Sequence, residues 1–411
     1  MFLVDLPLIF VLAGLVLYTV LAGADFGAGL WQLTAGSGPG AERLRDHAHR
    51  AIAPVWEANH VWLIFAITVM WTAYPVAFGS IASTLTLPLF IAAVGIIMRG
   101  VAYAMDAGAT DPAERRTIDS VFALSSVLTP FALGTVVGGI ASRRVPVGNA
   151  AGSPFSSWLN PTSVFLGILA VAAAAFLSAT YLAADAARLA DYDLERRFRL
   201  RAVGAGTVTG AVALAGLTVV HADAPPLYQG LVHGPGLIGL ICSALAAFTT
   251  LALVLLLRYG PARYTAALAV AAIILGWALA QHPVLLPGLT VAAAAASRDT
   301  LIAVVVAVLA GAILLFPALG LLFRLYLSGR FDPVPSVARP APVAPPRTRP
   351  HHSRLLGRVA AACLVAGFGL LTVSAGAAAH AVGVACLLGA IASGFLAATP
   401  ALIANQPSGP P

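Results

Sequence analysis

The segment PVWEANHVWLIFAITVM, residues 54–70, places a carboxylate, an amide, an imidazole and two indoles at the start of an otherwise apolar run. A run of this kind is typical of a helix that crosses a membrane. A carboxylate at membrane depth is energetically costly, so Glu57 indicates a functional site with a partner nearby. A second acid, Asp25, lies in the glycine-rich segment GADFGAG, residues 23–29, inside the preceding apolar run. We therefore expect the function of the chain to centre on these two acids.

The composition is that of a membrane protein with many spans. Hydrophobic residues make up 60% of the 411 positions, only 9% are charged, and the mean hydropathy is +0.92. Soluble domains carry roughly 25% charged residues. The net charge of +7 is attributed to arginines in membrane-flanking loops, so no nucleic-acid partner is predicted. The three cysteines are scattered and form no metal-binding or disulfide pattern, so no metal site is predicted either.

Eleven apolar runs are long enough to cross a membrane as helices, since a span needs about 20 mostly apolar residues. Only helices and closed barrels satisfy backbone groups in lipid, and these runs are too long for barrel strands. The predicted fold is therefore all-α, a polytopic membrane bundle of about nine core helices followed by a two-helix hairpin. The predicted spans are residues 6–33, 52–74, 80–105, 118–141, 162–188, 202–221, 235–258, 263–281, 299–326, 356–376 and 379–403.

This pattern divides the chain into three parts. Residues 1–330 are predicted to form the nine-helix membrane domain. Residues 331–354 are rich in proline and arginine, which predicts an extended cytoplasmic linker. Residues 355–411 are rich in glycine and alanine and nearly devoid of polar groups. Small residues permit close helix packing, so this last part is interpreted as an accessory transmembrane hairpin.

The placement of arginines predicts the orientation. Of the 23 basic residues, all arginines, 19 lie in or beside the loops after spans 1, 3, 5, 7 and 9, three lie on the opposite side, and Arg99 lies inside a span. By the positive-inside rule the N-terminus is outside and the C-terminus is cytoplasmic. The first apolar run is expected to stay as a span, because Asp5 stands where a signal peptide would be basic.

Four ionisable residues lie toward the cytoplasmic side of the predicted spans: Asp25, Glu57, Arg99 and Asp185. Asp25 lies about 12 Å and Glu57 about 8–9 Å from the cytoplasmic end of its span, at about 1.5 Å per residue. Both acids are candidates for proton transfer, and the alternative for Asp25 is a structural hydrogen bond to a neighbouring helix. Arg99 either pairs with one of the acids or extends to the interface. Asp185 is interpreted as an end-of-helix charge.

Three neighbours are candidates to support Glu57. His60 lies one helical turn on, within reach of a shared hydrogen-bond network, and simple packing is the alternative. Asn59 is expected to hold a backbone or carboxylate partner. Trp56 fits an aromatic belt at the membrane interface.

These motifs resemble the second subunit of the cytochrome bd family of quinol oxidases. The resemblance rests on GADFGAG, residues 23–29, and more specifically on IAPVWEANHVWL, residues 52–63, which is similar to that family's proline, Trp-acid-x-Asn and Trp-Leu signature. Order and spacing agree over about residues 1–330. Weaker matches are AYP (73–75), MRGVAY (98–103), LNP (159–161) and the stretch from His282–Pro283 to Pro287.

The resemblance implies a subunit of a bacterial membrane oxidase that oxidises quinol and reduces O2 to water. In that family subunit I carries the haems b558, b595 and d and the quinol site, so no catalytic residue is expected in this chain. Subunit II packs against subunit I as a pseudo-symmetric heterodimer, and a structural quinone and small accessory subunits are further expectations. The acids that match Asp25 and Glu57 are implicated in bringing cytoplasmic protons to the haems, with Arg99, Asn59, His60 and Trp56 in support.

The chain also departs from the family pattern. Many members have Asp where Glu57 stands, and the additional acid common in helix 1 is absent here. Residues 331–411 lie outside the resemblance. The alternative function is a proton-coupled secondary transporter that uses the same two acids. It predicts an inverted repeat around a midplane site, and the sequence shows no clear repeat. A purely structural membrane scaffold is the third hypothesis.

Overall fold

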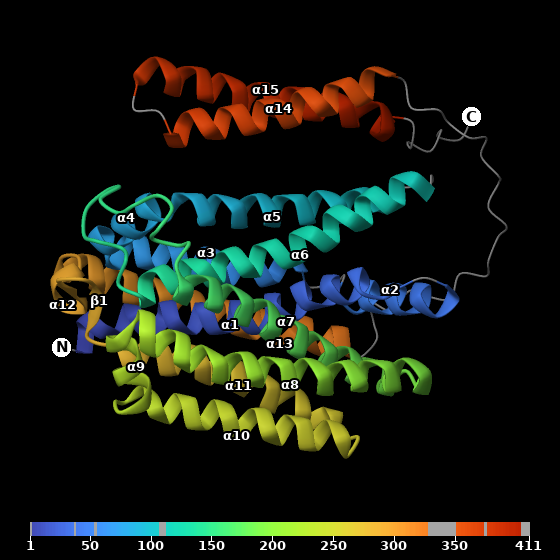
Figure 1. The fold of residues 1–411 in the computed structure, drawn as a ribbon, viewed down its shortest axis with the longest axis horizontal. Helices are drawn as coiled ribbons and strands as arrows, with labels where there is room; N and C mark the ends of the chain where they lie inside the picture. Colours follow the sequence, from blue (N-terminus) through green and yellow to red (C-terminus); the bar gives the residue numbers. More distant parts are fainter. Residues whose placement is uncertain are drawn as a thin grey trace. The chain divides into compact units, whose positions relative to one another are not determined.

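The structure is a computed structural model that describes residues 2–36, 38–52, 56–106, 112–327, 351–373 and 376–403 (Figure 1). The described residues fall into two compact units. The first contains residues 2–106 and 115–327, and the second contains the two C-terminal helices. The predicted linker lies outside the described residues as far as residue 350, and its last four residues, 351–354, belong to a helix, so the predicted boundary was four residues too late.

The described residues are almost entirely helical, which confirms the predicted all-α fold. Among them, nine helices are long and apolar enough to cross a membrane, and two shorter apolar stretches, Ala58–Ala73 and Ala378–Gly394, occupy the remaining predicted spans. In chain order the helices at the predicted spans are α1 (Phe2–Leu33), α3 (Trp56–Ala73), α5 (Thr86–Asp106), α6 (Pro112–Ala141), α7 (Pro161–Arg188), α8 (Tyr192–Asp223), α10 (Gly236–Leu255), α11 (Tyr259–Gln281), α13 (Arg298–Leu327), α14 (His351–Val373) and α15 (Ala377–Ile403).

Shorter elements connect these helices. They are α2 (Pro39–Ile52), α4 (Pro75–Thr84), α9 (Pro225–Val232), α12 (Val291–Ala294), β1 (Val284–Leu286) and β2 (Leu289–Thr290). The two strands form an antiparallel hairpin in which Leu286 pairs with Leu289. Gly288 supplies the positive φ of +77° that this tight turn requires. The hairpin follows the end of α11 at Gln281, which is also where the predicted span 263–281 ends.

Capping side chains fix two of the helix starts. α7 begins at Pro161, one residue before the predicted span, and Asn160 Oδ1 accepts a hydrogen bond from the Ser163 backbone N–H at 2.9 Å. α8 begins at Tyr192 instead of near residue 202, because Asp191 accepts a hydrogen bond from the Leu194 backbone N–H at 3.2 Å. The sequence-based start of α8 was too late because it followed hydrophobicity, and the first turns of this helix are polar.

α2 is a helix that the sequence analysis did not predict. Charged residues are spread through it, so no apolar run marks it, but its periodicity is amphipathic. Ala41, Leu44, His47 and Ala48 are buried on one face, whereas Arg43 is exposed. This buried face packs against α1 and α7. α2 therefore lies against the bundle, next to the end of α1.

α1 and α7 form the core of the first unit. α1 packs against α7 and α3, and α7 packs in addition against α8 and α11 (Figure 1). Gly27 lets α1 approach α7 closely, because a Cβ at this position would overlap the backbone of Ala174. Glycine permits such close contacts between membrane helices. The GADFGAG segment is therefore a packing surface that brings Asp25 into the interior of the bundle.

The second unit consists of α14 and α15, which pack against each other. Gly367 and Gly383 lie at their contact, since a Cβ on Gly367 would lie 2.9 Å from the Gly383 carbonyl oxygen. The small residues of this pair permit the close packing that the sequence predicts for the hairpin.

Candidate functional site

Asp25 on α1 and Arg99 on α5 form a fully buried ion pair. Arg99 Nη2 lies 2.6 Å from Asp25 Oδ1, and it also donates to the Asp25 backbone carbonyl oxygen at 2.9 Å. Asp25 is 2% exposed and Arg99 is 1% exposed. Of the two roles considered for Arg99, the structure therefore shows pairing with an acid and not extension to the interface.

Besides Asp25, Arg99 contacts further side chains on α1 and α6. Its Nη1 donates to the hydroxyl of Ser126 on α6. Its guanidinium carbon lies 4.1 Å from the ring centroid of Phe122 and 5.2 Å from that of Phe26, so both rings make cation–π contacts. Gly29 provides the room, because a Cβ there would overlap Ser126 Oγ and lie 3.2 Å from Arg99 Nη1. The positive charge of Arg99 is thus stabilised by the Ser126 hydroxyl and two aromatic rings as well as by the Asp25 carboxylate.

The second carboxylate oxygen of Asp25 has different surroundings. Asp25 Oδ2 is buried and makes no hydrogen bond with a described residue. The hydroxyl of Tyr18, two helical turns earlier on the same face of α1, is also buried and makes none within the described part of the chain. Leaving a buried polar atom without a hydrogen bond costs about 1–3 kcal/mol, and more for a charged group. In a native protein such an atom calls for an explanation, and strain, a catalytic role and a bound water or ion are the usual ones.

The start of α3 lies beside this pair. Asn59 is buried, and its Nδ2 donates to the Leu21 backbone carbonyl oxygen of α1 at 3.4 Å. The His60 ring packs edge-on against Tyr18 and Phe26, with centroid separations of 5.9 and 6.2 Å. Two kinds of partner were expected for Asn59, a backbone group or a carboxylate, and the structure shows the backbone group. The His60 ring lies beside Phe26, the residue that follows Asp25.

The structure describes only the backbones of Glu57 and Trp56. Both lie in the first turn of α3, and their side chains are outside what the structure describes. Asn59 and His60 follow within about one turn and contact α1 at Leu21 and Phe26. The backbone of Glu57 is therefore close in sequence to the point at which α3 meets the Asp25 segment, and its role stays a prediction.

Three residues of this site were missed by the sequence analysis: Tyr18, Phe122 and Ser126. Tyr18 lies seven positions before Asp25, a spacing that places both on one face of a helix and was available in the sequence. Phe122 and Ser126 lie on α6, which no local pattern links to Asp25. Their contribution becomes visible only when the helices pack.

α2 links this site to the end of the bundle that is predicted to be cytoplasmic. His49 stacks on Tyr103 of α5, with ring centroids 5.2 Å apart, and its ring lies 6.3 Å from that of Phe122. His47 Nε2 lies 3.9 Å from Asp185 Oδ2. Asp185 also pairs with Arg188 one turn later at 3.0 Å, so it serves as the end-of-helix charge that the sequence indicates.

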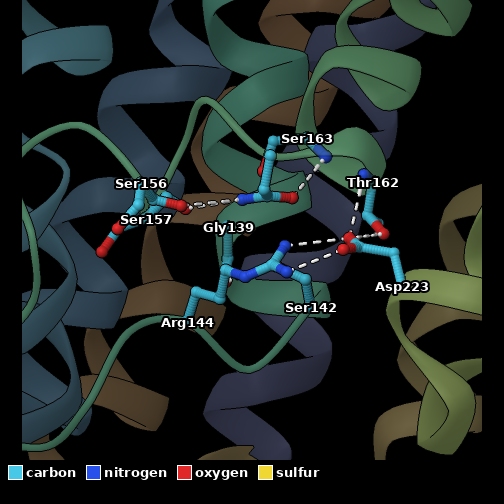
Figure 2. A network of polar contacts seen from close by, with 9 residues as sticks. Gly139, Ser142, Arg144, Ser156, Ser157, Thr162, Ser163 and Asp223 are labelled. Atoms are coloured by element: carbon cyan, nitrogen blue, oxygen red, sulfur yellow. Dashed lines mark hydrogen bonds and ion pairs between the residues drawn. The ribbon is translucent and has the colours of Figure 1, made fainter.

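A second arginine–aspartate pair lies at the opposite end of α7, and Figure 2 shows its network. Arg144 donates to both oxygens of Asp223 at 2.8 and 2.7 Å. The backbone N–H and the hydroxyl of Thr162 donate to Asp223 Oδ2 at 3.1 and 2.6 Å. The hydrogen bond to Asp223 raises the pKa of Arg144, so the guanidinium stays charged. This network joins the loop after α6, the start of α7 and the end of α8.

Among the described residues, no group of three or more His, Cys, Asp or Glu side chains is arranged to hold a metal ion. The rings of Tyr18 and Phe26 pack edge-on against His60. The most completely buried carboxylate in the described part of the chain is that of Asp25.

Comparisons with known proteins agree with this architecture. The family model described as cytochrome bd terminal oxidase subunit II matches residues 3–326. The cytochrome bd ubiquinol oxidase subunit 2 of Bacillus subtilis is 29% identical over 132 residues, which are 32% of this chain and 38% of that relative. The cytochrome bd-I ubiquinol oxidase subunit 2 of Escherichia coli K12 is 25% identical over 215 residues, which are 50% of this chain and 54% of that relative.

A chain in the solved structure of bd oxidase from Geobacillus thermodenitrificans is also similar. The TM-score is 0.65 at 28% sequence identity, and the match covers 80% of this chain and 99% of that chain. The two curated relatives are matched over about half of their own length or less. The family match, in contrast, runs through nearly all of the nine predicted core spans. The chain therefore belongs to the cytochrome bd terminal oxidase subunit II family.

Proposed function

We propose that this chain is subunit II of a cytochrome bd-type quinol:O2 oxidoreductase, in which it helps deliver cytoplasmic protons to a haem-bearing partner. The observation that carries the proposal is the buried Asp25, whose Oδ1 is held by Arg99 while its Oδ2 makes no bond with a described residue. The relatives from Bacillus subtilis and Escherichia coli are named as subunits of ubiquinol oxidases, and an equivalent role is proposed here.

The geometry suits reversible protonation at Asp25 Oδ2. When Asp25 is charged, Arg99 neutralises it at 2.6 Å. When a proton binds at Oδ2, Arg99 still contacts the Asp25 backbone carbonyl, the Ser126 hydroxyl and two aromatic faces, so its charge stays compensated. Both charge states are therefore compatible with the same packing, as a proton relay requires.

Glu57 is the second relay carboxylate in this proposal. Asn59 and His60 hold the start of α3 against α1, which keeps the backbone of Glu57 in a fixed position relative to Asp25. Trp56 is proposed to anchor the same turn at the membrane interface. A carboxylate inside a membrane is costly, so Glu57 is proposed to exchange protons with Asp25 and not to be an unrelated structural group.

The catalytic chemistry is proposed to lie on subunit I. The haems expected there, b558, b595 and d, supply electron transfer from quinol and the reduction of O2 to water. With quinol oxidised at the outer face and protons taken from the cytoplasm, turnover would generate a proton-motive force without a pump. A structural quinone, small accessory subunits and an N-terminus outside the bacterial cell membrane belong to the same proposal.

The proposal also assigns the parts of the chain. Residues 1–330 form the oxidase subunit, residues 331–350 act as a cytoplasmic linker, and residues 351–411 add an accessory hairpin. The described helices of the last part, α14 and α15, form a compact unit of their own, which is consistent with an accessory role.

The test replaces each acid in the assembled complex, Asp25→Asn and Glu57→Gln, with Asp185→Asn as the matched control. We expect O2-dependent quinol oxidation and proton uptake to fall at least about ten-fold for the first two, since a positioned proton-transfer group is worth about 10²–10⁴-fold. The haem absorption spectrum and the activity of Asp185→Asn are expected to stay unchanged. Unchanged turnover and proton uptake in both test variants would contradict the relay role.

The comparisons give no support to a proton-coupled transporter. The family model and the relatives from two organisms all belong to oxidase subunits. A haem-free preparation of this chain that exchanges a solute for protons would be needed to restore that alternative.

A further inference from the structure

An open groove of about 750 Å³ lies on the side of the first unit, between α1, α6, α7 and α8. Apolar side chains line most of it, among them Val127, Phe131, Ile168 and Val208. Its two charged lining residues are Arg197 and Arg201, which lie near the start of α8. The groove is therefore apolar along its length and cationic at one end, and neither the proposed proton relay nor the haem chemistry uses it.

The cationic end is held in place by its neighbours. Arg201 Nη1 donates to the Arg197 backbone carbonyl at 3.3 Å, and its guanidinium lies 5.7 Å from the ring centroid of Trp31. Trp31 is itself fixed, because its Nε1 donates to the Ala175 backbone carbonyl at 3.0 Å. Arg197 pairs with Asp193 at 3.1 Å. The described residues offer Arg201 no carboxylate within ion-pair distance, so its charge is available to a ligand.

The dimensions match one leaflet of a membrane. From Arg201 to Val212, the last α8 residue of the groove, eleven helical residues span about 16 Å. The hydrocarbon core of a bilayer is about 30 Å thick, so one leaflet contributes about 15 Å. Arg201 would then lie at headgroup depth while the apolar length of the groove runs toward the midplane.

We propose that this groove binds one anionic phospholipid, with its phosphate at Arg201 and Arg197 and an acyl chain along α8. Guanidinium groups bind phosphate oxygens well, and basic pockets between helices on the cytoplasmic side are typical sites for anionic headgroups. The predicted orientation places this end in the cytoplasmic leaflet, which is the leaflet rich in such lipids. A neutral quinone head would leave the Arg201 charge uncompensated, so charge complementarity favours the phospholipid.

Different substitutions test the cationic end and the apolar length of the groove separately. Arg201→Gln removes the charge, and Arg201→Lys keeps it. Gly204 lines the groove and a Cβ there has no atom within 4 Å, so Gly204→Leu fills the groove without a clash at Cβ. The matched controls are Arg196→Gln, an exposed arginine on the same helix, and Gly210→Leu, whose Cβ also meets no atom within 4 Å and which is not part of the groove.

The experiment incubates the protein, purified from membranes in mild detergent, with equal amounts of phosphatidylglycerol and phosphatidylcholine. Native mass spectrometry then counts the retained lipids. We expect the wild type to retain one phosphatidylglycerol in preference, Arg201→Gln to lower that preference about five-fold, and Gly204→Leu to abolish retention of either lipid. Arg201→Lys, Arg196→Gln and Gly210→Leu should behave like the wild type.

Three results would overturn the proposal. If the wild type retained phosphatidylglycerol and phosphatidylcholine equally, charge would play no part in binding. The same conclusion would follow if Arg201→Gln kept the wild-type preference for phosphatidylglycerol. Solvent extraction that yields a quinone, lost in Gly204→Leu but kept in Arg201→Gln, would assign the groove to a quinone. Each variant's thermal unfolding temperature is measured alongside, and a variant that fails to fold leaves the other substitution to decide. The lipid result is independent of proton uptake, so the two proposals stand or fall separately.

Discussion

Two arginine–aspartate pairs of this chain differ in how completely they are satisfied. In the pair of Arg144 and Asp223, both carboxylate oxygens accept from the guanidinium, and Thr162 donates twice more. In the pair of Asp25 and Arg99, one carboxylate oxygen is bonded and the other makes no bond with a described residue. The satisfied pair lies near the surface, with side chains 35% and 12% exposed, whereas the buried pair is nearly inaccessible. Completeness of bonding thus distinguishes the fully satisfied Arg144–Asp223 pair from the Asp25–Arg99 pair, at which we propose a proton relay.

The largest expected effect comes from breaking the buried pair. Arg99→Leu leaves the Asp25 carboxylate buried without its cation, and we expect the free energy of unfolding to fall by about 3–5 kcal/mol. Denaturant unfolding of the detergent-solubilised protein measures this change. The double variant Asp25→Leu with Arg99→Leu should recover most of the loss, because it removes both charges. A double variant as unstable as the single one would contradict this account.

A smaller loss is expected when the room beside Arg99 is filled. Gly29→Ala puts a methyl group where Ser126 Oγ lies, so either Ser126 or Arg99 must move. We expect a loss of about 2 kcal/mol in the free energy of unfolding. Gly210→Ala is the control, since its Cβ would meet no atom within 4 Å. Equal stability of the two variants would show that α1 and α6 can separate without cost.

The satisfied pair predicts a stability change without a change in activity. Asp223→Asn keeps one oxygen for Thr162 but loses the charge-assisted bonds from Arg144. We expect the free energy of unfolding to fall by about 1 kcal/mol. Turnover of the assembled oxidase, corrected for the amount of folded protein, should match the wild type. A fall in corrected turnover as large as that of Asp25→Asn would erase the distinction between the two pairs.

The smallest effect is expected at a third, exposed pair. Asp191 caps α8, and Arg43 donates to it at 2.7 Å. The hydrogen bond from the Leu194 backbone N–H lowers the pKa of Asp191, with Arg43 contributing further. A lowered folded-state pKa stabilises the protein above the unfolded value of about 3.9, and this stabilisation is lost as the pH falls through the folded value. Between about pH 5 and pH 3 the wild type should therefore lose slightly more stability than Asp191→Asn. A parallel pH dependence of the two proteins would show that the cap carries no charge effect.

The sequence predicted the spans and the identity of the polar residues, because both follow from local composition. It left two alternatives for Arg99, since the partner of Arg99 lies 74 residues away and no local pattern reports such a contact. It missed α2, whose charges hide an amphipathic periodicity, and it missed Asp223, which follows an apolar span as an ordinary end-of-helix acid would. Ser126 and Phe122 could not be assigned because their role depends on how α6 packs. The sequence therefore did not predict contacts between residues far apart in the chain or the roles of polar residues at helix ends.

The length of α8 has a mechanical consequence. Its 32 residues extend for about 48 Å, well beyond the roughly 30 Å of bilayer hydrocarbon. Arginines surround its first turns, and Asp223 at its last residue is tied to Arg144. Because both ends of α8 carry charged groups, a shift of the helix along the membrane normal would bury charge in the hydrocarbon, which is costly. We therefore expect α8 to set the height of the first unit in the bilayer, and with it the depth of Asp25, the proposed relay carboxylate.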